Sequence, residues 1–107
     1  MRLLLDECVP RPLLRDLANY DAHHVVDLGW SSKRNGELLN LMLSERFMAL
    51  LTVDQNTPFQ QNLRASGVSV VIIIAKTNRV QELRPLMPQV RRALDAIRPG
   101  ELVTIGG

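Results

Sequence analysis

The sequence contains little of what several classes of protein require. A single cysteine, Cys8, cannot form an internal disulfide, so folding does not require an oxidising compartment. The longest nearly continuous apolar stretch, residues 68–75, is far shorter than the roughly 20 residues that span a bilayer. The N-terminus reaches the acidic pair Asp6-Glu7 without the apolar segment of a signal peptide. These absences predict a cytoplasmic protein with no membrane segment.

Several motifs that define large enzyme classes are also missing. No Gly-x-Gly-x-x-Gly follows the first predicted strand, which argues against a dinucleotide-binding fold. Neither a Walker loop nor a Gly-x-Ser-x-Gly elbow occurs, so P-loop NTPases and serine hydrolases of that type are excluded. Aromatic residues make up only 4% of the chain, and Trp30 is the one credible platform for stacking a base.

The chain does have enough apolar residues for a core, and its charge is unevenly distributed. A length of 107 residues suits one domain, residues 1–107, and a hydrophobic content of 46% excludes disorder of the whole chain. Residues 1–54 carry 6 basic and 8 acidic side chains, whereas residues 55–107 carry 7 and 3. A basic patch beside an acidic site is the expected footprint of an enzyme that acts on nucleic acid.

Apolar runs alternate with helix-length segments along the chain. The predicted strands are residues 2–5, 24–26, 47–53, 68–74 and 102–105, and the predicted helices are residues 10–19, 37–46, 57–66 and 80–97. Strands separated by helices imply a mostly parallel sheet with helices on both faces. We therefore predict a three-layer α/β/α fold with a five-stranded sheet in the order 2-1-3-4-5. In such a sheet the ligand crevice lies beyond the carboxyl ends of the strands, where the chain reverses direction.

Two aspartates occupy equivalent positions in this scheme. Asp6 follows the apolar residues 3–5, and Asp54 follows residues 50–53. If the first and third strands are parallel neighbours, the two carboxylates lie about one strand spacing, ~4.8 Å, apart. Close like charges repel unless a cation lies between them, and Mg²⁺ bound there could activate a water for attack on a phosphodiester. The alternative is that each aspartate merely ends its strand and caps the following helix.

Four segments resemble those of a known family: LLLDECVP at residues 3–10, LGW at 28–30, NGELL at 35–39 and LTVDQN at 51–56. With these segments the chain resembles the short PIN-like nucleases, compact relatives of the PIN-domain ribonucleases that act as toxins in bacterial toxin–antitoxin pairs. The resemblance covers nearly the whole chain. It implies a PIN-like fold and a nuclease that uses Mg²⁺ or Mn²⁺ to cut single-stranded RNA. Formation of a homodimer and neutralisation by a small cognate antitoxin are implied on the same basis.

The resemblance also implies roles for particular residues. Asp6 matches the first acidic residue of the family's site and Asp54 the later one, with Thr52 orienting phosphate or water. Where PIN domains have an acidic residue at the start of a helix, this chain has Asn35, whose carbonyl oxygen can bind a hard cation but brings no charge.

Two glutamates are candidates for the missing charge. Glu37 could supply this charge by reaching the site around the first turn of the helix, and Glu7 could supply it from the first loop. For Glu37 a structural role is an equal alternative, because an acidic side chain in the first turn of a helix favours the helix dipole by about 0.3–1 kcal/mol.

Phosphate contacts are predicted from two basic loops and one polar side chain. Lys33 and Arg34 follow the second predicted strand, and Lys76 and Arg79 follow the fourth. Both loops lie at the edge of the sheet that carries the aspartates. Asn56, shortly after Asp54, either orients the site or forms the turn into the next helix.

Two other functions fit part of this pattern. A receiver domain uses the same strand order and would employ Asp6, Glu7 and Asp54, but receivers end their fifth strand with a lysine that is absent here. A PIN-like domain that binds RNA or a protein without catalysis is the second alternative, and Asn35 favours it.

A further group of residues is predicted to be structural. The set His23, His24 and Asp27 matches no standard zinc spacing. The acidic neighbours of Cys8 oppose formation of a reactive thiolate.

Overall fold

The computed structural model describes residues 1–33, 35–53 and 59–106, and for residue 35 and residues 59–61 it describes the backbone. Its strands are β1 (Arg2–Leu5), β2 (Asp21–His24), β3 (Ala49–Val53), β4 (Ser69–Ile74) and β5 (Leu102–Gly106). Its α-helices are α1 (Asn35–Ser44), α2 (Phe59–Ala65), α3 (Val80–Leu83) and α4 (Met87–Ala96), and its 3-10 helices are η1 (Arg11–Leu17) and η2 (Arg84–Leu86). Within these ranges, no helix combines the length and the apolar character that crossing a membrane requires.

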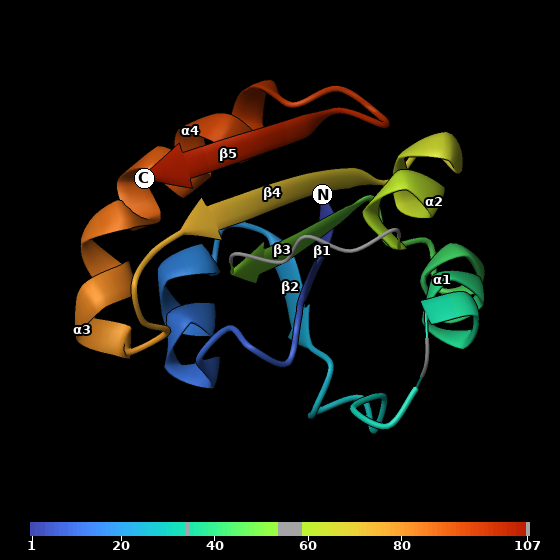
Figure 1. Cartoon of the computed structure of the whole chain (residues 1–107), viewed down its shortest axis with the longest axis horizontal. Helices are drawn as coiled ribbons and strands as arrows, with labels where there is room; N and C mark the ends of the chain where they lie inside the picture. Colours follow the sequence, from blue (N-terminus) through green and yellow to red (C-terminus); the bar gives the residue numbers. More distant parts are fainter. Residues whose placement is uncertain (34, 54–58, 107) are drawn as a thin grey trace.

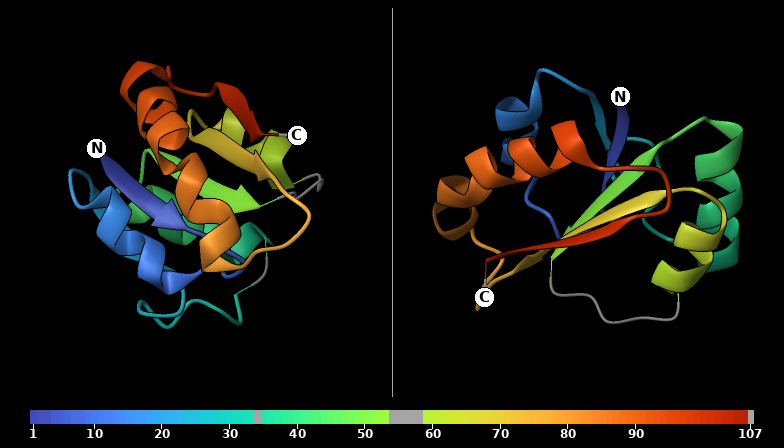
Figure 2. Two further views of the ribbon diagram at one scale, coloured as in Figure 1. Left: turned by 90° about the vertical axis from the view of Figure 1, so that its left-hand side faces the viewer. Right: turned by 90° about the horizontal axis from the view of Figure 1, so that it is seen from above.

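The five strands form one parallel sheet in the order β2-β1-β3-β4-β5, which confirms the predicted fold (Figure 1). Helices α1 and α2 cover one face of this sheet, while η1, α3 and α4 cover the other. Figure 2 shows η1 and α4 side by side on that second face. The chain runs outward from β1 to β2 and then crosses back to β3 on the other side of β1. The carboxyl ends of β1 and β3 therefore flank the point at which the chain reverses direction.

Side chains point alternately to the two faces of the sheet along each strand, and this divides the core into two layers. Leu3 and Leu5 of β1 belong to the layer beneath η1, α3 and α4, whereas Leu4 belongs to the layer beneath α1 and α2. Strand β4 is Val- and Ile-rich because both of its faces are covered, and only its last residue, Ile74, is exposed. The predicted strand over residues 68–74, buried on both faces, is confirmed with the bounds Ser69–Ile74 and with Ile74 as its exposed end.

The second strand lies earlier in the sequence than predicted. It spans Asp21–His24, whereas the apolar pattern favoured residues 24–26. Polar residues are tolerated because β2 is an edge strand, and Asp21 pairs with Arg2 of the neighbouring strand at 2.8 Å. Val25 is buried but already belongs to the turn, since its carbonyl accepts the Trp30 N–H.

The first helix is a 3-10 helix rather than the predicted α-helix over residues 10–19. Proline occupies positions 10 and 12, and Pro12 lies in the first turn, where its missing N–H costs no hydrogen bond. The 3-10 geometry is seen in the Leu13 N–H, which donates to the Pro10 carbonyl, three residues back. Leu13 and Leu17 are nevertheless fully buried, so this segment still covers the sheet as predicted.

Helices α1 and α2 end with the same backbone motif but with different residues. After α2, Gly67 has a positive φ of 86°, and Val68 N–H donates to Leu63 O. After α1, the equivalent position is Arg46, with a φ of 62°, and Phe47 N–H donates to Met42 O. A side chain in this left-handed conformation is strained by about 1–2 kcal/mol, which glycine avoids.

Arg46→Gly is therefore expected to raise the free energy of unfolding by about 0.5–1 kcal/mol, measured by urea denaturation. Gly67→Ala is the matched reverse change. An added Cβ at Gly67 meets no atom within 4 Å, so its expected loss of about 1 kcal/mol reflects the backbone alone. A variant Arg46→Gly no more stable than the wild type would contradict the assignment of strain to Arg46.

Candidate active site at the carboxyl ends of the strands

Asp6 extends β1 by one residue beyond the regular strand. Its N–H donates to the Leu51 carbonyl at 2.9 Å, which continues the ladder between β1 and β3 and brings Thr52 opposite Asp6. The side chain is half-buried, and both of its oxygens are engaged. Oδ1 accepts the Glu7 N–H at 2.8 Å, and Oδ2 accepts the Thr52 hydroxyl at 3.0 Å. The Asp6 carboxylate is therefore held in one orientation at the reversal point of the sheet.

Thr52 links Asp6 to the only cysteine. Its hydroxyl is 3.4 Å from the Cys8 Sγ, and Thr52 as a residue is only 1% exposed. Because the Thr52 hydrogen is donated to a carboxylate, only the thiol can donate in this contact, and the thiol also faces the Val53 carbonyl at 3.9 Å. Contacts therefore connect the Cys8 thiol through Thr52 to Asp6. The resemblance gave Thr52 a role toward phosphate or water, and in this geometry its hydroxyl orients Asp6.

His24 ties together the loops that follow β1 and β2. The imidazole is 1% exposed, its Nε2 lies 2.7 Å from the Val9 carbonyl, and its Nδ1 accepts the Val26 N–H at 3.1 Å. A carbonyl can only accept and an N–H can only donate, so this geometry assigns the proton to Nε2. The Val9 carbonyl lies three residues after Asp6, and His24 therefore anchors the loop that carries the carboxylate.

The other histidine has different neighbours. His23 Nε2 is 2.7 Å from Asp21, and its ring packs edge-on against Phe47 at 5.8 Å. Among the residues that the structure covers, no three His, Cys, Asp or Glu side chains form a group able to hold a metal ion. Asp27 has a partner elsewhere, since it pairs with Arg11 at 2.5 Å.

Two glutamates predicted near the site lie on exposed surface. Glu7 is exposed directly beside Asp6. Glu37 is exposed in the first turn of α1, with its Oε2 3.9 Å from the Lys33 ammonium. This contact and the helix dipole fit the structural alternative for Glu37, and its predicted catalytic role stays a prediction.

Four of the predicted site residues have no described side chain. Asp54, Asn56 and Arg34 lie outside the described residues, and so does the side chain of Asn35. The predicted pairing of Asp6 with Asp54 therefore stays a prediction. Strand β3 brings the chain as far as Val53 at the edge that carries Asp6.

The loop after β4 reaches the Asp6 loop across the end of β3. The Asn78 amide donates to the Cys8 carbonyl at 3.1 Å, a contact between residues 70 apart in sequence. Lys76 and Arg79 flank Asn78 and are exposed.

Trp30, the predicted stacking platform, is partly buried and packs edge-on against Phe47 at 5.7 Å.

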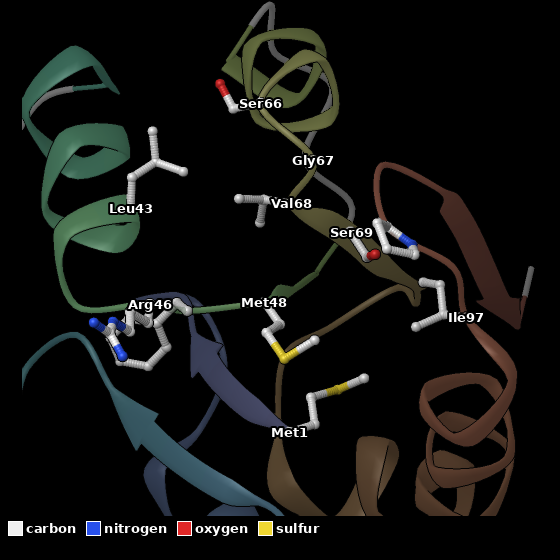
Figure 3. Close-up of a pocket in the computed structure, with 11 residues that line it drawn as sticks. Met1, Leu43, Arg46, Met48, Ser66, Gly67, Val68, Ser69 and Ile97 are labelled. Carbon is white, nitrogen blue, oxygen red and sulfur yellow. The ribbon is translucent and has the colours of Figure 1, made fainter.

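The described part of the chain also contains an apolar pocket of about 310 Å³, at the opposite end of the sheet (Figure 3). Met1, Leu43 and Met48 line it, and each is at least 40% exposed. Its wall is formed by the connections that lead into β1, β3, β4 and β5, so it lies at the amino ends of the strands. None of the predicted site residues lines this pocket.

A network away from the site connects the start of β2 to α4. The Tyr20 hydroxyl lies 2.6 Å from Asp95 Oδ1 and 3.0 Å from the Arg91 carbonyl. Burial, followed by the hydrogen bond to Asp95, raises the pKa of Tyr20 to about 12. At the first residue of β2, hydrogen bonds from His23 and then Arg2 lower the pKa of Asp21.

Tyr20 is the only tyrosine, so its ionisation can be followed by ultraviolet absorbance without overlap. We expect a midpoint near the value of about 12 rather than 10.0, and a midpoint closer to 10 in Asp95→Asn. Because the folded state binds this proton more tightly, the unfolding free energy should fall as the pH rises from 10 toward 12. A wild-type midpoint at 10 would show that the contact with Asp95 does not persist in solution.

The fold and the site together define a class: a three-layer α/β/α domain with an aspartate fixed at the carboxyl end of its first strand. Comparisons of the chain with protein-family models, with curated proteins and with solved structures found no match. Any narrower assignment therefore depends on the chemistry of the site.

Proposed function

We propose that this protein is an endoribonuclease of the PIN-like type that uses Mg²⁺ or Mn²⁺ to hydrolyse phosphodiester bonds in single-stranded RNA. The observation that carries this proposal is the Asp6 carboxylate, fixed by two hydrogen bonds at the reversal point of a parallel sheet. Ligands of such sheets bind at this point. The proposal extends to a homodimer, a small protein antitoxin and a cytoplasmic location.

The chemistry of Asp6 fits a hard divalent cation. From the described residues, each of its oxygens accepts one hydrogen bond, which leaves a lone pair, and carboxylate oxygens are the ligands that Mg²⁺ prefers. Asp54 would be the second ligand, with Glu7 and Asn35 as further candidates. When bound, such an ion polarises a phosphoryl oxygen and makes water a stronger nucleophile.

The protein's own contribution is to fix geometry and charge in advance. Thr52 and the Glu7 N–H hold Asp6 in position before any substrate arrives, so no reorganisation is needed during the reaction. Lys76 and Arg79 supply positive charge for the phosphodiester backbone on a loop that is tied to the Asp6 loop through Asn78.

The test is an assay with purified protein and an end-labelled single-stranded RNA. We expect cleavage with Mg²⁺ or Mn²⁺, none after chelation, and restoration when the ion is added back. A fully base-paired RNA of the same sequence is the matched substrate control and should be cut more slowly. Binding of the ion without cleavage of any RNA would favour the non-catalytic PIN-like module instead.

A further inference from the structure

Basic side chains near Asp6 lie on two sides of it, and the two sides differ in how far their charge is already neutralised. On the β2 side, Arg11 pairs with Asp27 at 2.5 Å and Lys33 lies 3.9 Å from Glu37. On the β4 side, Lys76 and Arg79 are exposed, and neither forms an ion pair with any residue that the structure describes. Among the residues that the structure describes, the uncompensated positive charge therefore lies toward β4.

The β4 side is connected to the Asp6 loop by a side-chain hydrogen bond, as the β2 side is through His24 and the Val9 carbonyl. Asn78, between the two basic residues, donates to the Cys8 carbonyl at 3.1 Å. The Cys8 thiol in turn contacts Thr52, whose hydroxyl donates to Asp6. Lys76 and Arg79 thus flank an anchor point that is fixed relative to the carboxylate.

We infer that the phosphodiester backbone of a bound single strand leaves the Asp6 site over Cys8 and Asn78 and crosses Lys76 and Arg79, rather than passing over the β2 side. This inference rests on the proposed function and adds to it the direction of the nucleic acid. Two cations on an anchored loop are available to neighbouring phosphates, whereas Arg11 and Lys33 would first have to leave their carboxylates.

The same arrangement implies recognition of the backbone rather than the bases. The segment from Lys76 to Arg79 contains no aromatic residue, and Trp30 packs against Phe47 on the β2 side. Binding should therefore depend strongly on salt and little on sequence, because phosphate contacts release counterions whatever the base.

The experiment measures binding of a fluorescently labelled oligouridylate RNA by anisotropy, in EDTA to prevent cleavage, between 50 and 200 mM salt. Each phosphate contact on a single strand contributes about 0.7 to the slope of log affinity against log salt. The double variant Lys76→Ala/Arg79→Ala should lower this slope by about 1.4. Its loss of affinity over that fourfold salt range should then be about sevenfold smaller than that of the wild type.

Two double variants with the same change in charge serve as controls. Arg46→Gly/Arg98→Ala removes two cations at the pocket on the opposite end of the sheet, where Arg46, Ile97 and Pro99 are lining residues. Arg11→Ala/Lys33→Ala removes the two paired cations on the β2 side. Both should keep the wild-type slope, and denaturation curves establish that all three variants are folded.

The inferred path is overturned if Lys76→Ala/Arg79→Ala keeps the wild-type slope, if Arg11→Ala/Lys33→Ala lowers it as much, or if the wild type does not bind the RNA at 50 mM salt. These outcomes are separate from failure of the nuclease proposal. Binding in EDTA with the expected slopes would support the path even without cleavage, and cleavage with an unchanged slope would refute the path alone.

Discussion

Asp6→Asn is expected to lower the rate of metal-dependent RNA cleavage at least about 100-fold. Mutation of residues that merely orient a metal ligand typically costs 10–100-fold, and this change removes the charge of the proposed ligand itself. Asparagine has nearly the same shape, and its one oxygen can accept either the Thr52 hydroxyl or the Glu7 N–H at this partly exposed position, so the fold should be retained. Initial rates at saturating Mg²⁺, together with the urea denaturation midpoint, separate the loss of chemistry from a loss of structure.

Thr52 provides a graded control for that result. Thr52→Val keeps the buried shape but removes the hydroxyl that donates to Asp6 at 3.0 Å, so we expect a smaller loss of about 10–100-fold. Thr52→Ser restores a hydroxyl and should recover most of the rate. If Asp6→Asn cuts RNA as fast as the wild type, Asp6 is not part of a catalytic site and the nuclease proposal is wrong.

The parts of the site that could be predicted from the sequence are those set by strand position. Asp6 follows an apolar run, and a carboxylate that ends the first strand of a 2-1-3-4-5 sheet must lie at the reversal point. Strand order and hydrophobic pattern were enough for this position. Thr52 was proposed only through the family resemblance, and its contact with Asp6 depends on the register that pairs Leu5 with Leu51, which strand order does not fix.

Contacts between loops could not be predicted in this way. The hydrogen bond from Asn78 to Cys8 joins residues 70 apart, and nothing in the local sequence of either loop encodes that distance. The edge strand β2 was misplaced for a related reason. Its polar residues are stabilised by Arg2 on the neighbouring strand, whereas periodicity detects only apolar burial.

His24 is the clearest case of a residue whose role depends on tertiary structure alone. Its two ring nitrogens bond the Val9 carbonyl and the Val26 N–H, and both partners are backbone groups with no signature in sequence. His24→Leu should lower the free energy of unfolding by about 2–4 kcal/mol. It fills similar space but leaves two polar groups without partners, at about 1–3 kcal/mol for each buried one.

Two further variants test the two hydrogen bonds of His24 separately. In Asn the amide oxygen takes the place of Nδ1, so His24→Asn should keep the Val26 contact and lose the Val9 contact. In Gln the amide nitrogen takes the place of Nε2, so His24→Gln should do the reverse. Each is expected to lose about half as much stability as His24→Leu, measured by urea denaturation.

The rate of RNA cleavage should also differ between His24→Asn and His24→Gln. Val9 lies on the Asp6 loop, so His24→Asn should slow cleavage more than His24→Gln at equal stability. Equal stability of His24→Leu and the wild type would show that the imidazole does not anchor this loop.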